Sequence, residues 1–134
     1  MNIQVSFGEG MQVNARFDKF TVHTDQPESN GGENTAPDPY SYFLTSLVTC
    51  AGFFVLRFCQ ARNIPMDGIS LSLENDWDAE QKLVKNIAIN ISLPPSFPAK
   101  YTSALIRATN ECSVKRALLN PPNIEVNAVQ TVAA

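Results

Sequence analysis

The spacing of apolar residues near the N-terminus predicts three short strands. Apolar and polar residues alternate within residues 1–8 and again within residues 13–17, and a period of two is typical of a strand with one face on a core. A third run begins at Phe20 and Val22, directly after Asp18-Lys19. We therefore expect an N-terminal meander of three strands.

A loop and a long helix follow. Residues 24–39 contain three prolines, the Gly31-Gly32 pair and many Asn, Asp, Ser and Thr, which is the composition of an irregular loop. Asp38 can accept a hydrogen bond from the first turn of a helix, and Pro39 can occupy the first helical position, where its missing N–H costs nothing. The helix is predicted from Tyr40 to about Asn63, and Pro65 ends it.

The middle of this helix, Phe43 to Cys59, is apolar on nearly every side. Such a helix is buried all round, and we expect it to lie between a sheet and a partner subunit. A membrane span is the competing interpretation. Thr45, Ser46 and Arg57 interrupt a run that is barely long enough to span a bilayer, and predicted strands surround it, so no membrane interaction is expected.

The second half of the chain predicts two strands, a helix and a last strand. Alternating apolar residues at 69–74 and 87–93 predict a pair of strands, and Asn75–Gln81 looks like the end of a hairpin that Trp77 anchors. Pro98 can open a helix that continues to Asn120, with one inward stripe formed by Tyr101, Leu105, Ala108 and Cys112.

Ile124, Val126 and Ala128 predict the last strand. The element order is βββ-α-ββ-α-β, in a single domain over residues 1–134.

Composition limits the classes of function. The chain has 134 residues, of which 44% are hydrophobic and 17% are charged, and this low charged share suggests surface hidden in an oligomer. The net charge is −3 and no basic stripe is present, which argues against nucleic-acid binding. The N-terminus has neither a basic segment nor a long apolar segment of the kind that secretory signals contain, so we expect a cytoplasmic protein.

The three cysteines are the main candidates for catalytic residues. They have no CxxC spacing and are accompanied by one histidine, so neither a disulfide scaffold nor a metal site is expected. Cys50 and Cys59 would lie about 13 Å apart along one helix and about 180° apart around it, and cannot pair. A pair between Cys50 and Cys112 is permitted. Cys59 is expected to be a buried apolar filler, and all three could be.

A reactive thiol needs a lowered pKa, and a nearby cation is one means of lowering it. The candidate cations are Arg16, Arg57, Lys115 and Arg116. The single histidine, His23, ends a strand, where a solvated or hydrogen-bonded role is expected. Aromatic residues at Tyr40 and Tyr42 could line a pocket or pack in the first helical turn. Gly31-Gly32 lacks the sequence context of a phosphate-binding loop.

Two segments carry a resemblance to a known family. GGENTAPDPYSYFLTSLVTC contains a Gly-Gly loop, a Pro-x-Pro helix start and a cysteine eleven residues after the second proline, and NECSVKRAL contains a cysteine followed by a small residue and valine. In this order they resemble the two cysteine motifs of the OsmC/Ohr family of osmotically inducible and organic hydroperoxide resistance proteins. The resemblance covers nearly the whole chain.

The resemblance implies an α+β fold in which antiparallel sheets wrap two central helices of an intertwined homodimer. It also implies a thiol peroxidase that needs no cofactor or metal. Cys50 would attack an organic hydroperoxide and become a sulfenic acid, Cys112 would resolve it as a disulfide, and an external dithiol would reduce that disulfide. Arg16 lies in the region of the family's thiolate-contacting arginine. We expect Tyr40, Tyr42, Phe53 and Phe54 to line the substrate pocket.

One position departs from the family pattern. Peroxidase members carry a glutamate ten residues before the reactive cysteine, where it forms an ion pair with the arginine, and this sequence has Tyr40 there. The chain therefore resembles the OsmC-like branch of the family. The alternative function is a redox-sensing or small-molecule-binding dimer without efficient peroxidase turnover.

Overall fold

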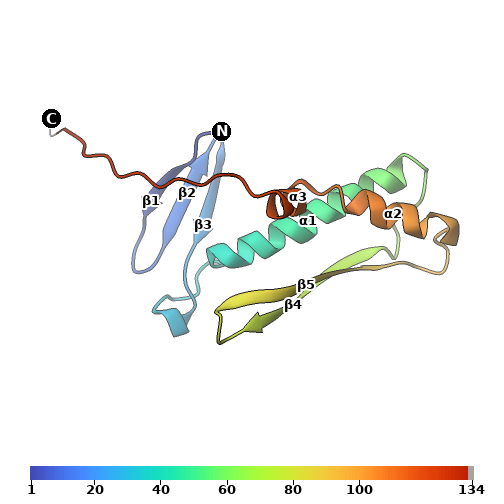
Figure 1. Ribbon diagram of the computed structural model, residues 1–134, viewed down its shortest axis with the longest axis horizontal. Coiled ribbons are helices and arrows are strands. Elements are labelled where there is room, and N and C mark those ends of the chain that lie inside the picture. The colour runs from blue at the N-terminus through green and yellow to red at the C-terminus, as the bar shows by residue number, and fades with distance from the viewer. Residues whose placement is uncertain (133–134) are drawn as a thin grey trace.

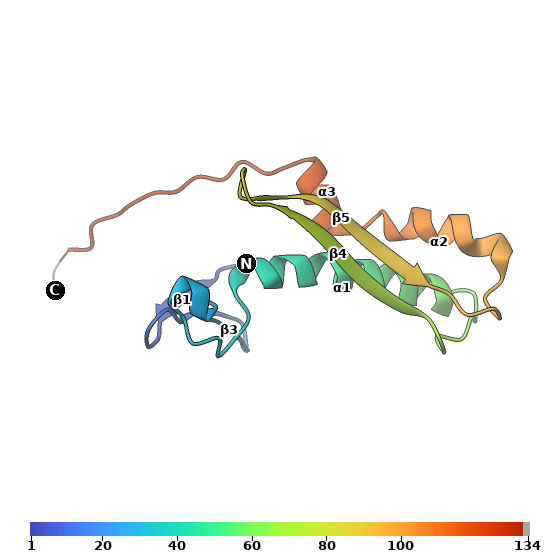
Figure 2. The same cartoon turned by 90° about the horizontal axis from the view of Figure 1, so that it is seen from below.

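The computed structural model describes residues 1–132 as an α+β fold built along one long helix (Figure 1). The three predicted N-terminal strands are confirmed: β1 (Gln4–Phe7), β2 (Val13–Phe17) and β3 (Phe20–Thr24) form an antiparallel sheet in the order β1-β2-β3. Figure 2 shows this sheet at the N-terminal end of the long helix rather than along its length.

The loop after β3 is folded around one buried carboxylate. Asp25 is 1% exposed and accepts hydrogen bonds from the N–H groups of Gln26, Glu33 and Thr35 and from the Thr35 hydroxyl. These four donors hold the pKa of Asp25 at about 2, with the Thr35 N–H contributing most. A short 3₁₀ turn, η1 (Glu28–Asn30), lies inside this loop.

The long helix, α1 (Pro39–Gln60), begins as predicted. The Asp38 side chain accepts hydrogen bonds from the N–H groups of Tyr40 and Ser41, and Pro39 occupies the first helical position. The Tyr42 hydroxyl donates to the carbonyl of His23 at 2.9 Å, which joins this turn to β3.

Burial of α1 is one-sided within the chain, which corrects the prediction of a helix buried all round. The buried residues form one stripe: Leu47, Ala51, Val55, Phe58 and Cys59. Phe53 and Leu56 lie on the other face, where 51% and 37% of their surface is exposed. By length and composition α1 could cross a membrane, a test that core helices also pass. Here other elements of the fold pack against its buried stripe.

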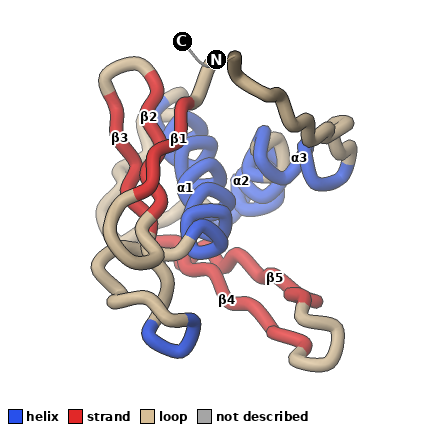
Figure 3. Tube along the Cα trace, turned by 90° about the vertical axis from the view of Figure 1, so that its left-hand side faces the viewer, coloured by secondary structure: helices blue, strands red, loops and turns tan. Residues whose placement is uncertain are grey.

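A two-stranded hairpin and two further helices cover this stripe. β4 (Ser70–Asp78) and β5 (Leu83–Ser92) pair antiparallel and run along α1 in Figure 1, and Figure 3 shows the turn of this hairpin projecting away from the helix. The strands are longer than predicted and include Asn75–Asp78, with a register shift at Asp76/Trp77. The side chain of Trp77 is 58% exposed and does not anchor the tip. Val55, Phe58, Cys59, Phe97 and Leu105 form the core cluster.

The predicted second helix is divided into three pieces. A 3₁₀ turn, η2 (Ala99–Tyr101), leads into α2 (Thr102–Thr109), and α3 (Ser113–Leu119) follows after a break. Cys112 is the N-cap residue of α3, with φ −49° and ψ 122° outside the helical region. The break turns α3 away from α2 and leaves the first N–H groups of α3 free for other acceptors.

The predicted last strand at Ile124–Ala128 is wrong for the single chain. Residues 121–132 are extended but carry no ladder hydrogen bonds, and Val126 is 94% exposed. A strand needs a neighbouring edge with which to exchange backbone hydrogen bonds. The tail crosses the N-terminal sheet in Figure 1 but lies apart from it in Figure 2, so it meets no such edge.

Candidate functional site: a two-cysteine site beside a cavity

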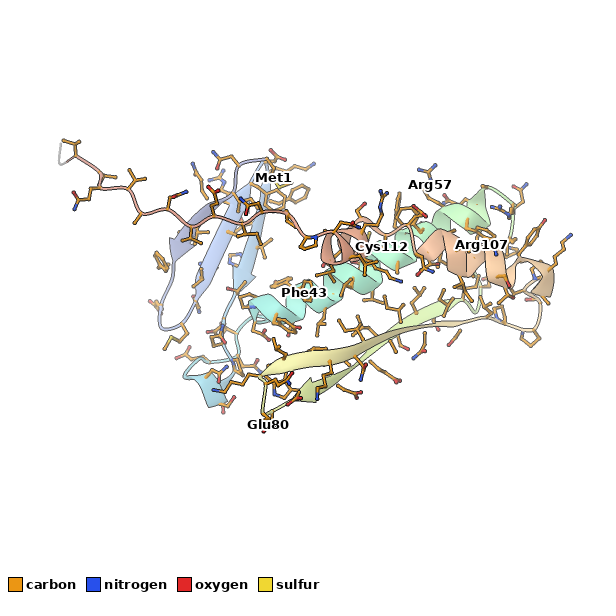
Figure 4. The ribbon with its side chains drawn as sticks, in the orientation of Figure 1. Met1, Phe43, Arg57, Glu80, Arg107 and Cys112 are labelled. Carbon is orange, nitrogen blue, oxygen red and sulfur yellow. The ribbon has the colours of Figure 1, made fainter. Side chains whose placement is uncertain are left out.

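The structure brings Cys50 and Cys112 together. Cys50 lies in the middle of α1 and is half-buried, and Cys112 is 2% exposed at the point where α3 begins. Figure 4 shows Cys112 beside α1 at this junction. The Cys112 Sγ also lies 4.0 Å from the carbonyl oxygen of Leu47, one turn before Cys50. Both thiols are free, and they are within hydrogen-bonding reach of each other.

The pKa of Cys50 is lowered although burial opposes ionisation. Burial alone would raise it, but hydrogen bonds from the Cys112 thiol and from the backbone N–H groups of Val114 and Ser113 outweigh that cost. The break before α3 makes these N–H groups available, because the first residues of a helix have no partners within it.

The pKa of Cys112 moves the other way. Burial raises it most, and the hydrogen bond to Cys50 raises it further because Cys112 is the donor of the pair. The N–H groups of Lys115 and Val114 oppose this rise without cancelling it. The arrangement therefore favours a thiolate at Cys50 and a neutral thiol at Cys112. A nucleophilic cysteine and a resolving cysteine require this distribution of charge.

None of the four candidate cations contributes to the lowered pKa of Cys50. Arg16 is exposed on β2, opposite Gln4 and Thr21, and the structure does not bring it to the thiols within one chain. The guanidinium of Arg57 lies 5.9 Å from the centre of the Phe53 ring.

The other two cations have partners in the second half of the chain. The Lys115 ammonium donates to Asn110, and Arg116 is paired with Glu111 at 3.9 Å. Hydrogen-bond donors, not cations, lower the pKa of Cys50.

The four aromatic residues predicted to bind substrate lie elsewhere on α1. The Tyr40 ring packs against Phe43 with their centres 5.3 Å apart, and Tyr42 is bonded to His23. Phe53 and Phe54 meet edge to face at 5.5 Å. The structure does not bring any of the four to the wall of the cavity beside Cys112, and their role in binding stays a prediction.

That cavity has a volume of about 460 Å³ and lies between α1, β5, α2 and α3. Its wall is mainly apolar and includes Cys112, whereas Cys50 is not part of it. The apolar members are Leu47, Ala51, Ile87, Ile89, Ile91, Leu93, Leu105, Ile106 and Leu118. The polar members other than Cys112 are Asn90, Thr102, Thr109, Asn110 and Lys115.

The sequence interpretation missed both this cavity and the two N–H donors. A signal for the donors was present, since Thr109, Asn110 and Ser113 surround Cys112 and are poor residues for a helix interior but good ones for a helix end. No pattern in the strand residues 87–93 distinguishes a side chain that lines a cavity from one that fills a core.

Comparison with solved structures shows the fold. The chain is similar to a protein from Psychrobacter arcticus 273-4 described as an osmotic stress induced and detoxification response protein (TM-score 0.74, 18% identity, 87% of each chain covered). It is also similar to an OsmC like protein from Mycoplasma pneumoniae (TM-score 0.70, 13% identity, 90% of this chain and 87% of the other).

A third similar structure is the organic hydroperoxide resistance protein OhrB of Bacillus subtilis (TM-score 0.54, 16% identity, 90% of each chain). No curated protein matches the sequence significantly. The family model described as OsmC-like protein matches residues 31–127, which include both cysteine motifs and most of the chain. The chain therefore belongs to the OsmC-like protein family.

Proposed function

We propose that this protein is a thiol peroxidase that reduces organic hydroperoxides through Cys50, with Cys112 as the resolving cysteine. The observation that carries the proposal is the hydrogen-bonded pair of thiols in which Cys50 has the lowered pKa. A thiolate is the nucleophilic form of cysteine, and the neighbouring neutral thiol is placed to react with the oxidised product. Family membership supports this proposal, since a similar structure is named for organic hydroperoxide resistance.

The reaction has two steps on the protein. The Cys50 thiolate attacks the peroxide oxygen distal to the organic group, the O–O bond breaks, and the alcohol leaves after taking up a proton. Cys50 becomes a sulfenic acid. The Cys112 sulfur then attacks the Cys50 sulfur, which forms the disulfide and releases water. An external dithiol returns both residues to thiols.

The test is a peroxide-consumption assay with cumene hydroperoxide and dithiothreitol. The wild-type protein should consume the peroxide, and Cys50→Ser should abolish consumption, while the matched change Cys59→Ser should leave most of the rate because Cys59 lies on the opposite flank of α1. Equal rates in the wild type and Cys50→Ser would remove the peroxidase proposal.

A second candidate is a redox-sensing or small-molecule-binding protein without efficient turnover. Tyr40, at the position of the family's glutamate, packs on Phe43, and no cation lowers the pKa of Cys50 in the described chain, residues 1–132. Mass spectrometry after one equivalent of hydroperoxide, combined with the peroxide-consumption assay in excess peroxide and dithiothreitol, separates the candidates. Rapid formation of a reducible Cys50–Cys112 disulfide with sustained turnover favours the peroxidase, and a disulfide that forms once with negligible turnover favours the sensor.

The proposed assembly is a homodimer. The face of α1 opposite its buried stripe exposes Phe53 and Leu56, and Gly52 on the same side has no heavy atom within 4 Å of where a Cβ would stand. This apolar face is suited to a second copy of the chain. Cytoplasmic localisation stays a prediction.

A further inference from the structure

We propose that the reducing thiol enters the cavity between β5 and α2 and attacks Cys112, not Cys50, so that Cys50 is the leaving group of the reduction. This inference rests on the proposed function, because it concerns the disulfide that the peroxidase cycle forms. It goes beyond that function because it assigns the sulfur that is attacked and the route by which the reductant arrives.

The two cysteines differ in their access to the cavity. Cys112 is part of the wall and Cys50 is not, although the two thiols are hydrogen-bonded to each other. A nucleophile inside the cavity therefore meets Cys112 and not Cys50. Attack on a disulfide proceeds with the leaving sulfur on the far side of the attacked one, and access decides which sulfur is attacked.

Because Cys112 is buried, the cavity is the route by which a reductant can reach it. Cys112 is 2% exposed whereas Cys50 is half-buried, so a reductant that arrives from the outer surface meets Cys50, and only one that enters the cavity meets Cys112. A volume of about 460 Å³ lies in the range of small-molecule sites in proteins, which is about 300–1,000 Å³. The mainly apolar wall, which includes Ile89, Leu105 and Ile106, favours a small thiol with an apolar body.

The chemistry of the leaving group agrees with this geometry. A thiolate leaves faster when its pKa is lower, and of the two cysteines Cys50 has the lowered pKa. The N–H groups of Ser113 and Val114 that bond to Cys50 are in place to receive the negative charge released on it. Expulsion of Cys112 would instead leave a thiolate on the sulfur that burial holds neutral.

The proposed reduction is balanced in two exchanges. The first thiolate of the dithiol bonds to the Cys112 sulfur, the Cys50–Cys112 bond breaks, and its electron pair leaves on Cys50. The second thiolate of the dithiol then attacks the dithiol sulfur that is bonded to Cys112. The bond between that sulfur and Cys112 breaks, and Cys112 leaves as a thiolate that takes up a proton. The dithiol ends as a cyclic disulfide, having supplied two electrons.

The test traps the first exchange with a monothiol, which cannot carry out the second. The Cys50–Cys112 disulfide is prepared with diamide, so that its formation does not depend on peroxidase activity. The oxidised protein is treated briefly with limiting benzyl mercaptan, quenched with acid, alkylated with N-ethylmaleimide and mapped by mass spectrometry. The benzylthio adduct should be about tenfold more abundant on Cys112 than on Cys50. An adduct mainly on Cys50, or in equal amounts on both, would overturn the inference.

A pair of variants tests the route. Ile106 lies in the cavity wall and is half exposed, so Ile106→Trp can narrow the cavity without disturbing the core. Its neighbour Arg107, labelled in Figure 4, is outside the wall. Ile106→Trp should slow reduction of the diamide-formed disulfide by benzyl mercaptan about tenfold, and Arg107→Trp should not slow it. Equal reduction rates in the two variants would contradict the route.

A further measurement separates this inference from the proposed function. The rate at which hydroperoxide oxidises Cys50 should be the same in Ile106→Trp as in the wild type. If hydroperoxide fails to oxidise the wild-type protein, the peroxidase proposal fails, while the diamide experiment still decides which sulfur a thiol attacks.

Discussion

Cys112, the N-cap residue of α3, lies within hydrogen-bonding reach of Cys50 in the middle of α1, and its thiol lowers the pKa of Cys50. The same sulfur that stabilises the Cys50 thiolate is the one proposed to capture its oxidised form. The same residue can therefore take both roles, and Cys112 does not have to be replaced beside Cys50 by another residue between the two steps. The local break between α2 and α3 makes this contact possible, because it turns Cys112 toward α1.

Removal of this hydrogen bond should raise the pKa of Cys50. In Cys112→Ala the strongest donor is lost while burial, which also raises the pKa, remains. The rate of alkylation of Cys50 by iodoacetamide, followed by mass spectrometry as a function of pH, should therefore reach its midpoint at higher pH than in the wild type. At neutral pH the rate should fall several-fold.

The matched variant for that experiment is Cys112→Ser. A hydroxyl can still donate to Cys50, so its alkylation midpoint should stay closer to the wild-type value than that of Cys112→Ala. If the two variants alkylate identically to the wild type, the Cys112 thiol does not set the pKa of Cys50.

The buried Asp25 should make stability depend on acid pH. Its pKa in the folded protein is about 2, below the ordinary value of 3.8, so the folded state binds this proton less readily than the unfolded state. The stabilisation is complete above about pH 4 and is lost as the pH falls through about 2. Urea unfolding between pH 5 and pH 2 should show the free energy of unfolding falling across this window.

Asp25→Asn should flatten that part of the pH profile and lower stability at neutral pH, because an amide cannot accept from all four donors. The matched change Asp67→Asn alters an exposed aspartate and should keep the wild-type slope. An unchanged slope in Asp25→Asn would show that other carboxylates cause the acid dependence.

A methyl group at Gly32 should disrupt the same loop. A Cβ at this position would stand 2.0 Å from the carbonyl oxygen of Gln26, a contact that only a backbone shift can relieve. Gly32→Ala should therefore lower the free energy of unfolding by about 2 kcal/mol, whereas Ser29→Ala at an exposed position of the loop should change it by less than about 0.5 kcal/mol. Chemical denaturation measures both, and equal effects would contradict the clash.

The exposed face of α1 should mediate the proposed dimer. Phe53→Lys places a charge in the apolar face and should weaken self-association about tenfold or more in sedimentation equilibrium. Gln60→Lys adds the same charge at the exposed end of α1 and should leave association unchanged. A wild-type protein that remains monomeric at all concentrations would remove the homodimer proposal.

Local patterns predicted the elements whose signals are complete within a few residues. Asp38-Pro39 fixed the start of α1, because the cap and the first helical residue are adjacent in sequence. Alternation predicted β2, β3 and the body of the hairpin, and the inward stripe correctly indicated that Leu105 and Cys112 are buried. Helix geometry permitted a pair between Cys50 and Cys112, and the family resemblance implied their roles.

Features that depend on distant partners could not be predicted in this way. The last strand failed because alternation at Ile124–Ala128 specifies a side-chain pattern but not a neighbouring edge. The break before Cys112 was missed because apolar spacing continues through it. The N–H donors to Cys50 and the cavity arise from how α3 lies against α1, which no local pattern encodes.

Complete burial of Cys59 limits the products that oxidation can form. Three thiols allow three pairings, but Cys59 is 0% exposed, and burial raises its pKa despite the opposing charge of Arg62. It also projects from the flank of α1 opposite Cys50. Exchange between disulfide isomers is thereby prevented. Repeated cycles of oxidation should therefore regenerate the Cys50–Cys112 disulfide without accumulating molecules in which Cys59 is paired.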